Sequence, residues 1–192
     1  MIIKNIDIFN TSVYSFKLNL NLNDLYKYCI EYEKNNKSNN RSGVGSFQSE
    51  NMDTNNLIIN SIANSFLEYA NFISYNNYKI KNKLNLGNFW FNINRYKDFN
   101  LEHDHPGSIL SGVYYVKTPR NSGNLVFKNN DNRNLYLPDD CLLEYNELNS
   151  FRYFLPPQEN CLHIFPSWLM HYVEPNLSKE ERISFSLNTK II

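Results

Sequence analysis

The sequence predicts a mainly β protein with flanking helices, an α+β chain whose helices come first. After residue 85, short segments rich in β-branched and aromatic residues alternate with turn residues, which is typical of strands. Before residue 85, two segments instead repeat their apolar residues at helical spacing. The length of 192 residues suits one core. We therefore expect a single domain over 1–192, with a helical support and loop region at 1–84 and a β core at 85–192.

The first predicted helix spans residues 22–34, with Asn23 or Asp24 near its start. Its apolar residues recur at i, i+3, i+4, i+7 and i+8, and they are Leu22, Leu25, Tyr26, Cys29 and Ile30. A polar segment, 35–51, contains two glycines and is predicted to be a loop. The second helix should follow Asp53 or Thr54 and carry an apolar stripe of Ile58, Ile62, Phe66, Tyr69 and Ile73.

About eight strands are predicted in the C-terminal part of the chain. Their number within so short a stretch favours a closed or double-sheet β architecture with the helices packed outside. The predicted strands are 87–96, 102–117, 123–128, 141–146, 151–155, 160–165, 171–174 and 182–190.

Composition excludes several classes of partner. Nineteen basic residues balance 19 acidic ones, so no overall field attracts nucleic acid or anionic lipid. No apolar run reaches the length of a membrane helix, and residues 1–16 lack the apolar core of a signal peptide. Cys29, Cys141 and Cys161 are too widely spaced for a disulfide framework, which indicates reduced thiols in the cytoplasm. The oligomeric state is left open.

Three of the four histidines have the spacing of a metal site. His103 and His105 are two residues apart, so on a strand both imidazoles point to one face while Asp104 points away. His171 follows a turn between two apolar segments, and a strand there could bring it across the barrel to complete a set of three. A histidine pair of this spacing is not specific by itself. His163 is expected to be a core or surface residue.

The segment 181–187 adds a second polar feature. Arg182, Ser184 and Ser186 alternate with apolar residues, so one face of this strand carries a guanidinium and hydroxyls. An arginine facing the inside of a barrel needs an anionic partner, and its fork matches a carboxylate. The alternative is an edge strand whose polar face meets water.

Together these features resemble the 2-oxoglutarate/iron(II) oxygenase superfamily, whose pattern is HxD…H…RxS. The chain is most similar to a subgroup met in marine bacteria and their phages, over roughly residues 43–188. The matching stretches are Gly45–Ser49, Phe89–Asn94, His103–Ser108, Leu110–Val116, Ser122–Phe127, Phe165–His171 and Glu181–Ser184. The resemblance implies a double-stranded β-helix (jelly roll, cupin-like) fold for 85–192. It also implies a cytoplasmic enzyme of a bacterium or an infected host cell.

The resemblance further implies Fe(II), 2-oxoglutarate and O₂ as cofactor and co-substrates. His103, His105 and His171 would hold the iron, with His105 in place of the usual aspartate; Asp104 could substitute only in a distorted strand. Arg182 and Ser184 would hold the distal carboxylate of 2-oxoglutarate. Either Tyr114 or Tyr115 could assist, and the break at residues 106–107 prevents a choice between them. Further polar residues that could line the pocket are Asn92 and Asn94.

The substrate is not predicted by the residues themselves. Resemblance to prolyl hydroxylases favours a peptide or protein side chain, but a small molecule such as a free amino acid, nucleotide or lipid is open. The segments 43–49 and 129–140 could clamp it. Two rival functions are a three-histidine dioxygenase that does not use 2-oxoglutarate and a non-catalytic binding or virion module. Arg182-x-Ser184 argues against the first, and succinate production would exclude the second.

Overall fold

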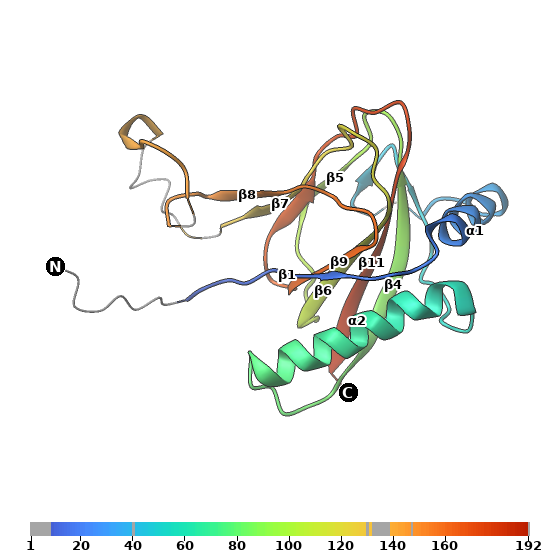
Figure 1. The fold of residues 1–192 in the computed structure, drawn as a ribbon, viewed down its shortest axis with the longest axis horizontal. Helices are drawn as coiled ribbons and strands as arrows, with labels where there is room; N and C mark the ends of the chain where they lie inside the picture. Colours follow the sequence, from blue (N-terminus) through green and yellow to red (C-terminus); the bar gives the residue numbers. More distant parts are fainter. Residues whose placement is uncertain (1–8, 40, 130, 132–138, 147, 192) are drawn as a thin grey trace.

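Two antiparallel β-sheets face each other, and two helices cover the outer side of the larger one (Figure 1). The computed structural model describes residues 9–39, 41–129, 131, 139–146 and 148–191. The six-stranded sheet has the order β1-β9-β6-β11-β4-β3, and the five-stranded sheet the order β2-β5-β10-β7-β8. This is the double-stranded β-helix expected from the resemblance, and the fold class is confirmed.

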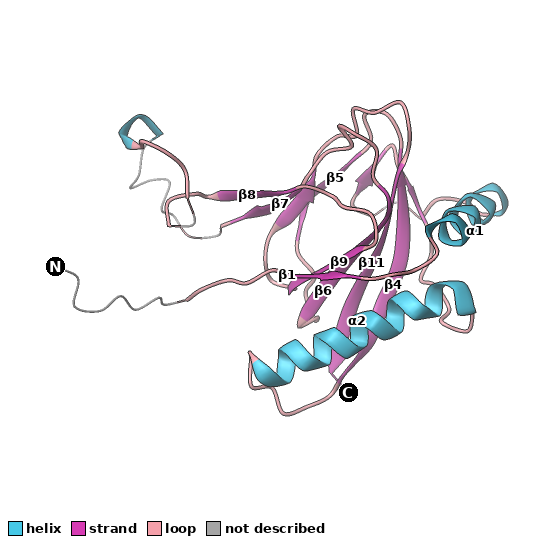
Figure 2. Ribbon diagram, viewed as in Figure 1, coloured by secondary structure: helices cyan, strands magenta, loops and turns pink. Residues whose placement is uncertain are grey.

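The strands of the larger sheet are β1 (Tyr14–Lys17), β9 (Cys161–Pro166), β6 (Leu110–Lys117), β11 (Arg182–Ile191), β4 (Leu84–Asn94) and β3 (Phe47–Gln48). Those of the smaller sheet are β2 (Gly43–Val44), β5 (Phe99–His103), β10 (His171–Val173), β7 (Leu125–Lys128) and β8 (Arg152–Leu155). Figure 2 shows the two sheets and the β7–β8 hairpin, which projects from them.

Both helices form where apolar residues repeat at helical spacing. Helix α1 (Leu22–Asn35) matches its prediction, but Asn21 caps it by accepting hydrogen bonds from the backbone N–H groups of Asn23 and Asp24. Helix α2 (Leu57–Asn76) begins two or three residues later than predicted, because Asn56 provides its cap.

The larger sheet has two chemically different faces, because side chains alternate along each strand. Its outer face is apolar and packs against α1 and α2 in the main core, where the rings of Phe89, Phe91 and Phe185 meet. Its inner face carries serine, asparagine, histidine and arginine side chains and points toward the smaller sheet. The polar residues of the candidate site therefore lie inside the barrel and away from the main core.

Several predicted strand boundaries were wrong. The predicted strand 102–117 is two strands, β5 and β6, separated at Pro106-Gly107, where Gly107 has a φ of +83°. The predicted strand 141–146 is wrong: a 3-10 turn (η1, Asp139–Cys141) and bends occupy it, and Leu143 is fully exposed. The predicted loop 35–51 contains β2 and β3, which pair with β5 and β4 and so join both sheets. The strand β1 was not predicted.

None of the helices in the described part of the chain is long and apolar enough to cross a membrane.

Candidate metal and co-substrate site

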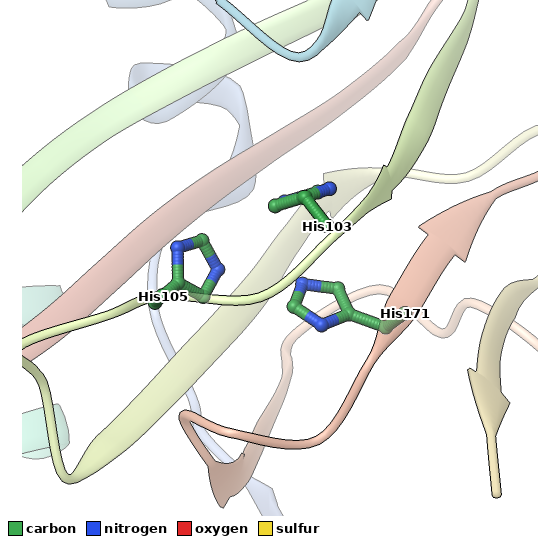
Figure 3. Close-up of side chains that lie close together, drawn as sticks. All are labelled: His103, His105 and His171. Carbon is green, nitrogen blue, oxygen red and sulfur yellow. The ribbon is translucent and has the colours of Figure 1, made fainter. Parts of the chain in front are cut away.

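Three histidines converge between the two sheets (Figure 3). His103 ends β5 and His171 begins β10, and the two are direct partners in the antiparallel register. His105 lies two residues beyond His103 on the segment leading to β6. One ring nitrogen from each of the three histidines lies within 4.8 Å of the others. This separation suits three ligands of one metal ion.

Two of these rings are fixed so that one nitrogen is left for a metal. The Nδ1 of His103 is 2.6 Å from the carbonyl oxygen of Leu101, and that of His171 is 2.8 Å from the carbonyl oxygen of Leu169. Because a carbonyl oxygen can only accept, each Nδ1 must carry a proton. The Nε2 of both rings is then unprotonated, which is the state that binds a metal.

The three imidazoles are neutral at pH 7. Burial lowers the pKa of His103 below its usual value, that of His105 to about 4 and that of His171 to about 3. The neighbouring rings lower the last two further. A neutral ring keeps its lone pair, so the cluster can bind a cation without first losing protons.

Arg182 lies deeper in the barrel, at the start of β11. Its side chain is 1% exposed, and its Nη1 donates to the carbonyl oxygens of Ser122, Gly123 and Glu174. Its Nη2 is buried and has no hydrogen-bond partner among the described residues. Burial lowers the pKa of Arg182, since the charged form is poorly solvated there. An unpaired donor on a buried cation is costly, and the carboxylate of a ligand would satisfy it.

The predicted neighbours of Arg182 are only partly brought together. Ser184 is the register partner of Tyr115 on β6, and both line one inner cavity with Arg182 and Asn92. Burial raises the pKa of Tyr115 to about 12, so its hydroxyl stays a hydrogen-bond donor.

Tyr114 and Asn94 are engaged elsewhere. Tyr114, one residue from Tyr115, points to the opposite face and donates to the Oδ1 of Asn160 at 2.6 Å. Asn94 is the register partner of Arg182, but its side chain donates to Asn100 and its carbonyl oxygen accepts from Asn176. Of the two tyrosines left open by the sequence, the structure therefore places Tyr115 in the cavity.

The histidines lie between this inner cavity and an outer one of about 410 Å³. Ser42, Trp90, His103 and His105 line both. The wall of the outer cavity includes five side-chain amides, those of Asn39, Gln48, Asn51, Asn88 and Asn188. Of the predicted clamp segments, 43–49 supplies Gln48 and Ser49 to this wall, whereas most of 129–140 lies outside the described residues.

Three further polar residues, Asp104, His163 and Asn188, lie outside the group of predicted ligands. Asp104 lines the outer cavity and is not part of the group of ligand atoms. His163 is buried in β9 with its Nδ1 2.7 Å from the Ser15 hydroxyl, a core position as expected. Asn188 was missed: its amide lies 3.4 Å from the Nδ1 of His105. Continuing the alternation 182, 184, 186 by one step along β11 would have found it.

The donor set fits Fe(II) and 2-oxoglutarate. Imidazole nitrogens suit ferrous iron, and three on one side of an ion leave positions opposite for other ligands. The unpaired Nη2 of Arg182 suits the far carboxylate of a dicarboxylic acid.

A family model described as "Putative 2OG-Fe(II) oxygenase" matches residues 88–188, just over half of the chain. The chain belongs to this family. It is therefore a 2-oxoglutarate- and Fe(II)-dependent oxygenase, as the resemblance implied. The matched range contains the three histidines, Arg182 and Ser184.

Solved structures share the fold at low sequence identity. A prolyl-4-hydroxylase from Pseudomonas putida matches with a TM-score of 0.64 and 14% identity, over 95% of this chain and 94% of that one. The viral collagen prolyl hydroxylase of Paramecium Bursaria Chlorella virus-1, solved with 2-oxoglutarate, matches with a TM-score of 0.62 and 15% identity, over 94% and 96%. HygX from Streptomyces hygroscopicus, solved with nickel and 2-oxoglutarate, matches with a TM-score of 0.65 and 7% identity, over 94% and 83%. No curated protein matches the sequence.

Proposed function

We propose that His103, His105 and His171 hold the iron, and that Arg182, Ser184 and Tyr115 hold 2-oxoglutarate. The observation that carries this proposal is the buried, unpaired Nη2 of Arg182 in the cavity that the histidines also line. A dioxygenase that did not use a dicarboxylic acid would have no use for this donor. The same observation argues against a non-catalytic module, since a buried charge without a ligand only costs stability.

Each residue then has a defined task. Iron and 2-oxoglutarate, when bound with O₂, supply the oxidising chemistry that converts a C–H bond to C–OH while 2-oxoglutarate becomes succinate and CO₂. Arg182 pairs with the distal carboxylate and so sets which end of the acid faces the histidines. The Ser184 and Tyr115 hydroxyls can donate to the same ligand. Val113, Leu125, Phe165 and Val173 complete the cavity wall and exclude water from it.

We propose a peptide or protein side chain as the substrate, bound in the outer cavity. The amides of its wall can both donate to and accept from a peptide backbone, and Trp90 offers an apolar surface beside His105, with the two ring centroids 6.0 Å apart. A similar structure, the prolyl hydroxylase of Trichoplax adhaerens (TM-score 0.66, 14% identity), was solved with a hypoxia inducible factor peptide. A small-molecule substrate is the second candidate, because the outer cavity of about 410 Å³ is in the size range of small-molecule sites.

We also propose that the enzyme works in the cytoplasm. The described cysteines, Cys29, Cys141 and Cys161, are all free thiols, which supports a reducing compartment. The assignment to a subgroup of marine bacteria and phages stays a prediction.

The test is product formation. The anaerobically iron-loaded protein is mixed with 2-oxoglutarate and O₂, and succinate is measured with and without a peptide library. Succinate that requires iron, 2-oxoglutarate and O₂ together, and that increases with particular peptides, supports both proposals. Iron-dependent O₂ consumption without succinate would favour the three-histidine dioxygenase, and no turnover by a folded, iron-bound protein would favour the binding module. The matched variant is Arg182→Gln, which keeps a polar side chain but loses the charge and the reach of the guanidinium.

A further inference from the structure

His105 differs from the other two histidines in what holds its ring. His103 and His171 each face a backbone carbonyl oxygen two residues earlier in the chain. The Nδ1 of His105 instead lies 3.4 Å from the side-chain amide nitrogen of Asn188. A carbonyl oxygen dictates the position of the ring proton, whereas an amide can present either a donor or an acceptor. The orientation of the Asn188 amide is therefore coupled to the nitrogen of His105 that carries the proton.

A buried polar chain holds the Asn188 amide in place. Its Oδ1 accepts from the hydroxyl of Ser111 at 2.8 Å, and the Ser111 hydroxyl lies 2.7 Å from that of Ser167. Asn188, Ser111 and Ser167 are at most 4% exposed. The carbonyl oxygen of Ser167 also accepts from the backbone N–H of His105 at 3.0 Å. Ring and backbone of His105 are thus fixed by one connected group of residues.

The proton positions along this chain allow only one arrangement that suits a metal. If Asn188 turns its NH₂ toward His105, the Nδ1 accepts and the neutral ring carries its proton on Nε2. That ring cannot bind a metal through Nε2. If the amide oxygen faces His105, the Nδ1 donates and Nε2 is free. The two amide orientations have the same shape, so hydrogen bonding alone distinguishes them.

We infer that Asn188 is the positioning residue of the third ligand: in the metal-bound protein its amide is turned end for end, so that its oxygen accepts from the Nδ1–H of His105 and its NH₂ donates to Ser111. Ser111 then donates to Ser167, which is compatible because either hydroxyl can be the donor. The inference rests on the proposed metal role of the three histidines. It assigns to a neutral side chain the task that backbone carbonyl oxygens perform for His103 and His171.

Substitutions at Asn188 distinguish a role in positioning His105 from a role in packing. Asn188→Leu removes the acceptor at similar volume, and we expect the affinity for Zn²⁺, measured by competition with a chromophoric chelator, to fall about 10- to 100-fold. Asn188→Asp can only accept at this position, so it should bind Zn²⁺ at least as tightly as the wild type. The control is Thr189→Val. Thr189 is on the same strand as Asn188, and the substitution removes the buried bonds between its hydroxyl and the backbone of Leu110 on β6. It should lower thermal stability and leave Zn²⁺ affinity unchanged.

Long-range ¹⁵N–¹H NMR of the Zn²⁺-loaded wild type reads the proton positions directly and does not depend on any variant folding. We expect all three histidines to be protonated at Nδ1 and metal-bound at Nε2. His105 protonated at Nε2 while His103 and His171 bind Zn²⁺ would overturn the role of Asn188 and leave the other two ligands in place. Unchanged Zn²⁺ affinity in Asn188→Leu would overturn it as well. Absence of Zn²⁺ binding in the folded wild type would instead overturn the metal site, and with it this inference.

Discussion

Replacement of Arg182 by alanine isolates the contribution of its guanidinium to co-substrate binding. The side chain is 1% exposed and its Nη2 has no protein partner among the described residues, so a bound carboxylate would form a desolvated, charge-assisted pair with it. Loss of such a pair costs about 2–5 kcal/mol. At about 1.4 kcal/mol per factor of ten, the Kd for 2-oxoglutarate should rise roughly 30-fold to several thousand-fold. Metal affinity should barely change.

The assay is calorimetric titration of 2-oxoglutarate into the Mn²⁺-loaded protein. Arg182→Lys should recover only part of the loss, because an ammonium group cannot reproduce the forked geometry. The matched control is Arg95→Ala: Arg95 makes a two-pronged pair with Glu33 at the surface, both N–O distances being 2.7 Å. That variant should bind 2-oxoglutarate as the wild type does. Wild-type affinity in Arg182→Ala, with the metal bound, would refute the reasoning.

The other residues make three further predictions. His105→Asp should retain or strengthen Fe²⁺ binding, because a carboxylate adds negative charge to the ligand set; loss of binding in a metal titration would contradict this. Tyr115→Phe should weaken 2-oxoglutarate binding several-fold, because one hydrogen bond is worth about 1 kcal/mol. Tyr114→Phe should leave 2-oxoglutarate binding unchanged and lower the Tm. The reverse pattern would exchange the roles of the two tyrosines. Burial lowers the pKa of His163 to about 4, so the unfolded state binds a proton at this residue more readily than the folded state. The contribution of neutral His163 to the free energy of unfolding is therefore complete above about pH 6.5 and is lost as the pH falls toward 4. Urea unfolding at several pH values should therefore be less pH-dependent in His163→Gln, and an equal dependence would exclude His163 as the titrating group.

Side-chain alternation made the candidate site predictable in part. On β11 it placed Arg182 and Ser184 on one face without knowledge of the partner strands. It also predicted that His103 and His105 lie together, although β5 ends at His103 and His105 follows on the segment after it. It could not pass the turn at residues 106–107, where the alternation is reset. The choice of Tyr115 over Tyr114 needed the register between β6 and β11, which only the folded sheet provides.

The errors in the predicted strands also arise because strand pairing is not visible in the local sequence. Leu143 and its neighbours resemble a strand locally, but a strand needs a partner, and none of the strands in the described part of the chain pairs with this exposed segment. The strands β2 and β3 are two residues each, too short for an alternation to be visible. Their pairing depends on β5 and β4, about 50 residues away in sequence. Local patterns therefore identified most strands and both helices. They failed where pairing with a distant segment determines whether a strand forms.

A crystal structure of the complex with Mn²⁺ and 2-oxoglutarate tests the site most directly. The proposed site predicts one metal ion about 2.1 Å from a nitrogen of each of His103, His105 and His171. It also predicts that the distal carboxylate of 2-oxoglutarate accepts a hydrogen bond from the Nη2 of Arg182. A metal ion bound elsewhere, or a 2-oxoglutarate molecule whose distal carboxylate lies away from Arg182, would contradict it.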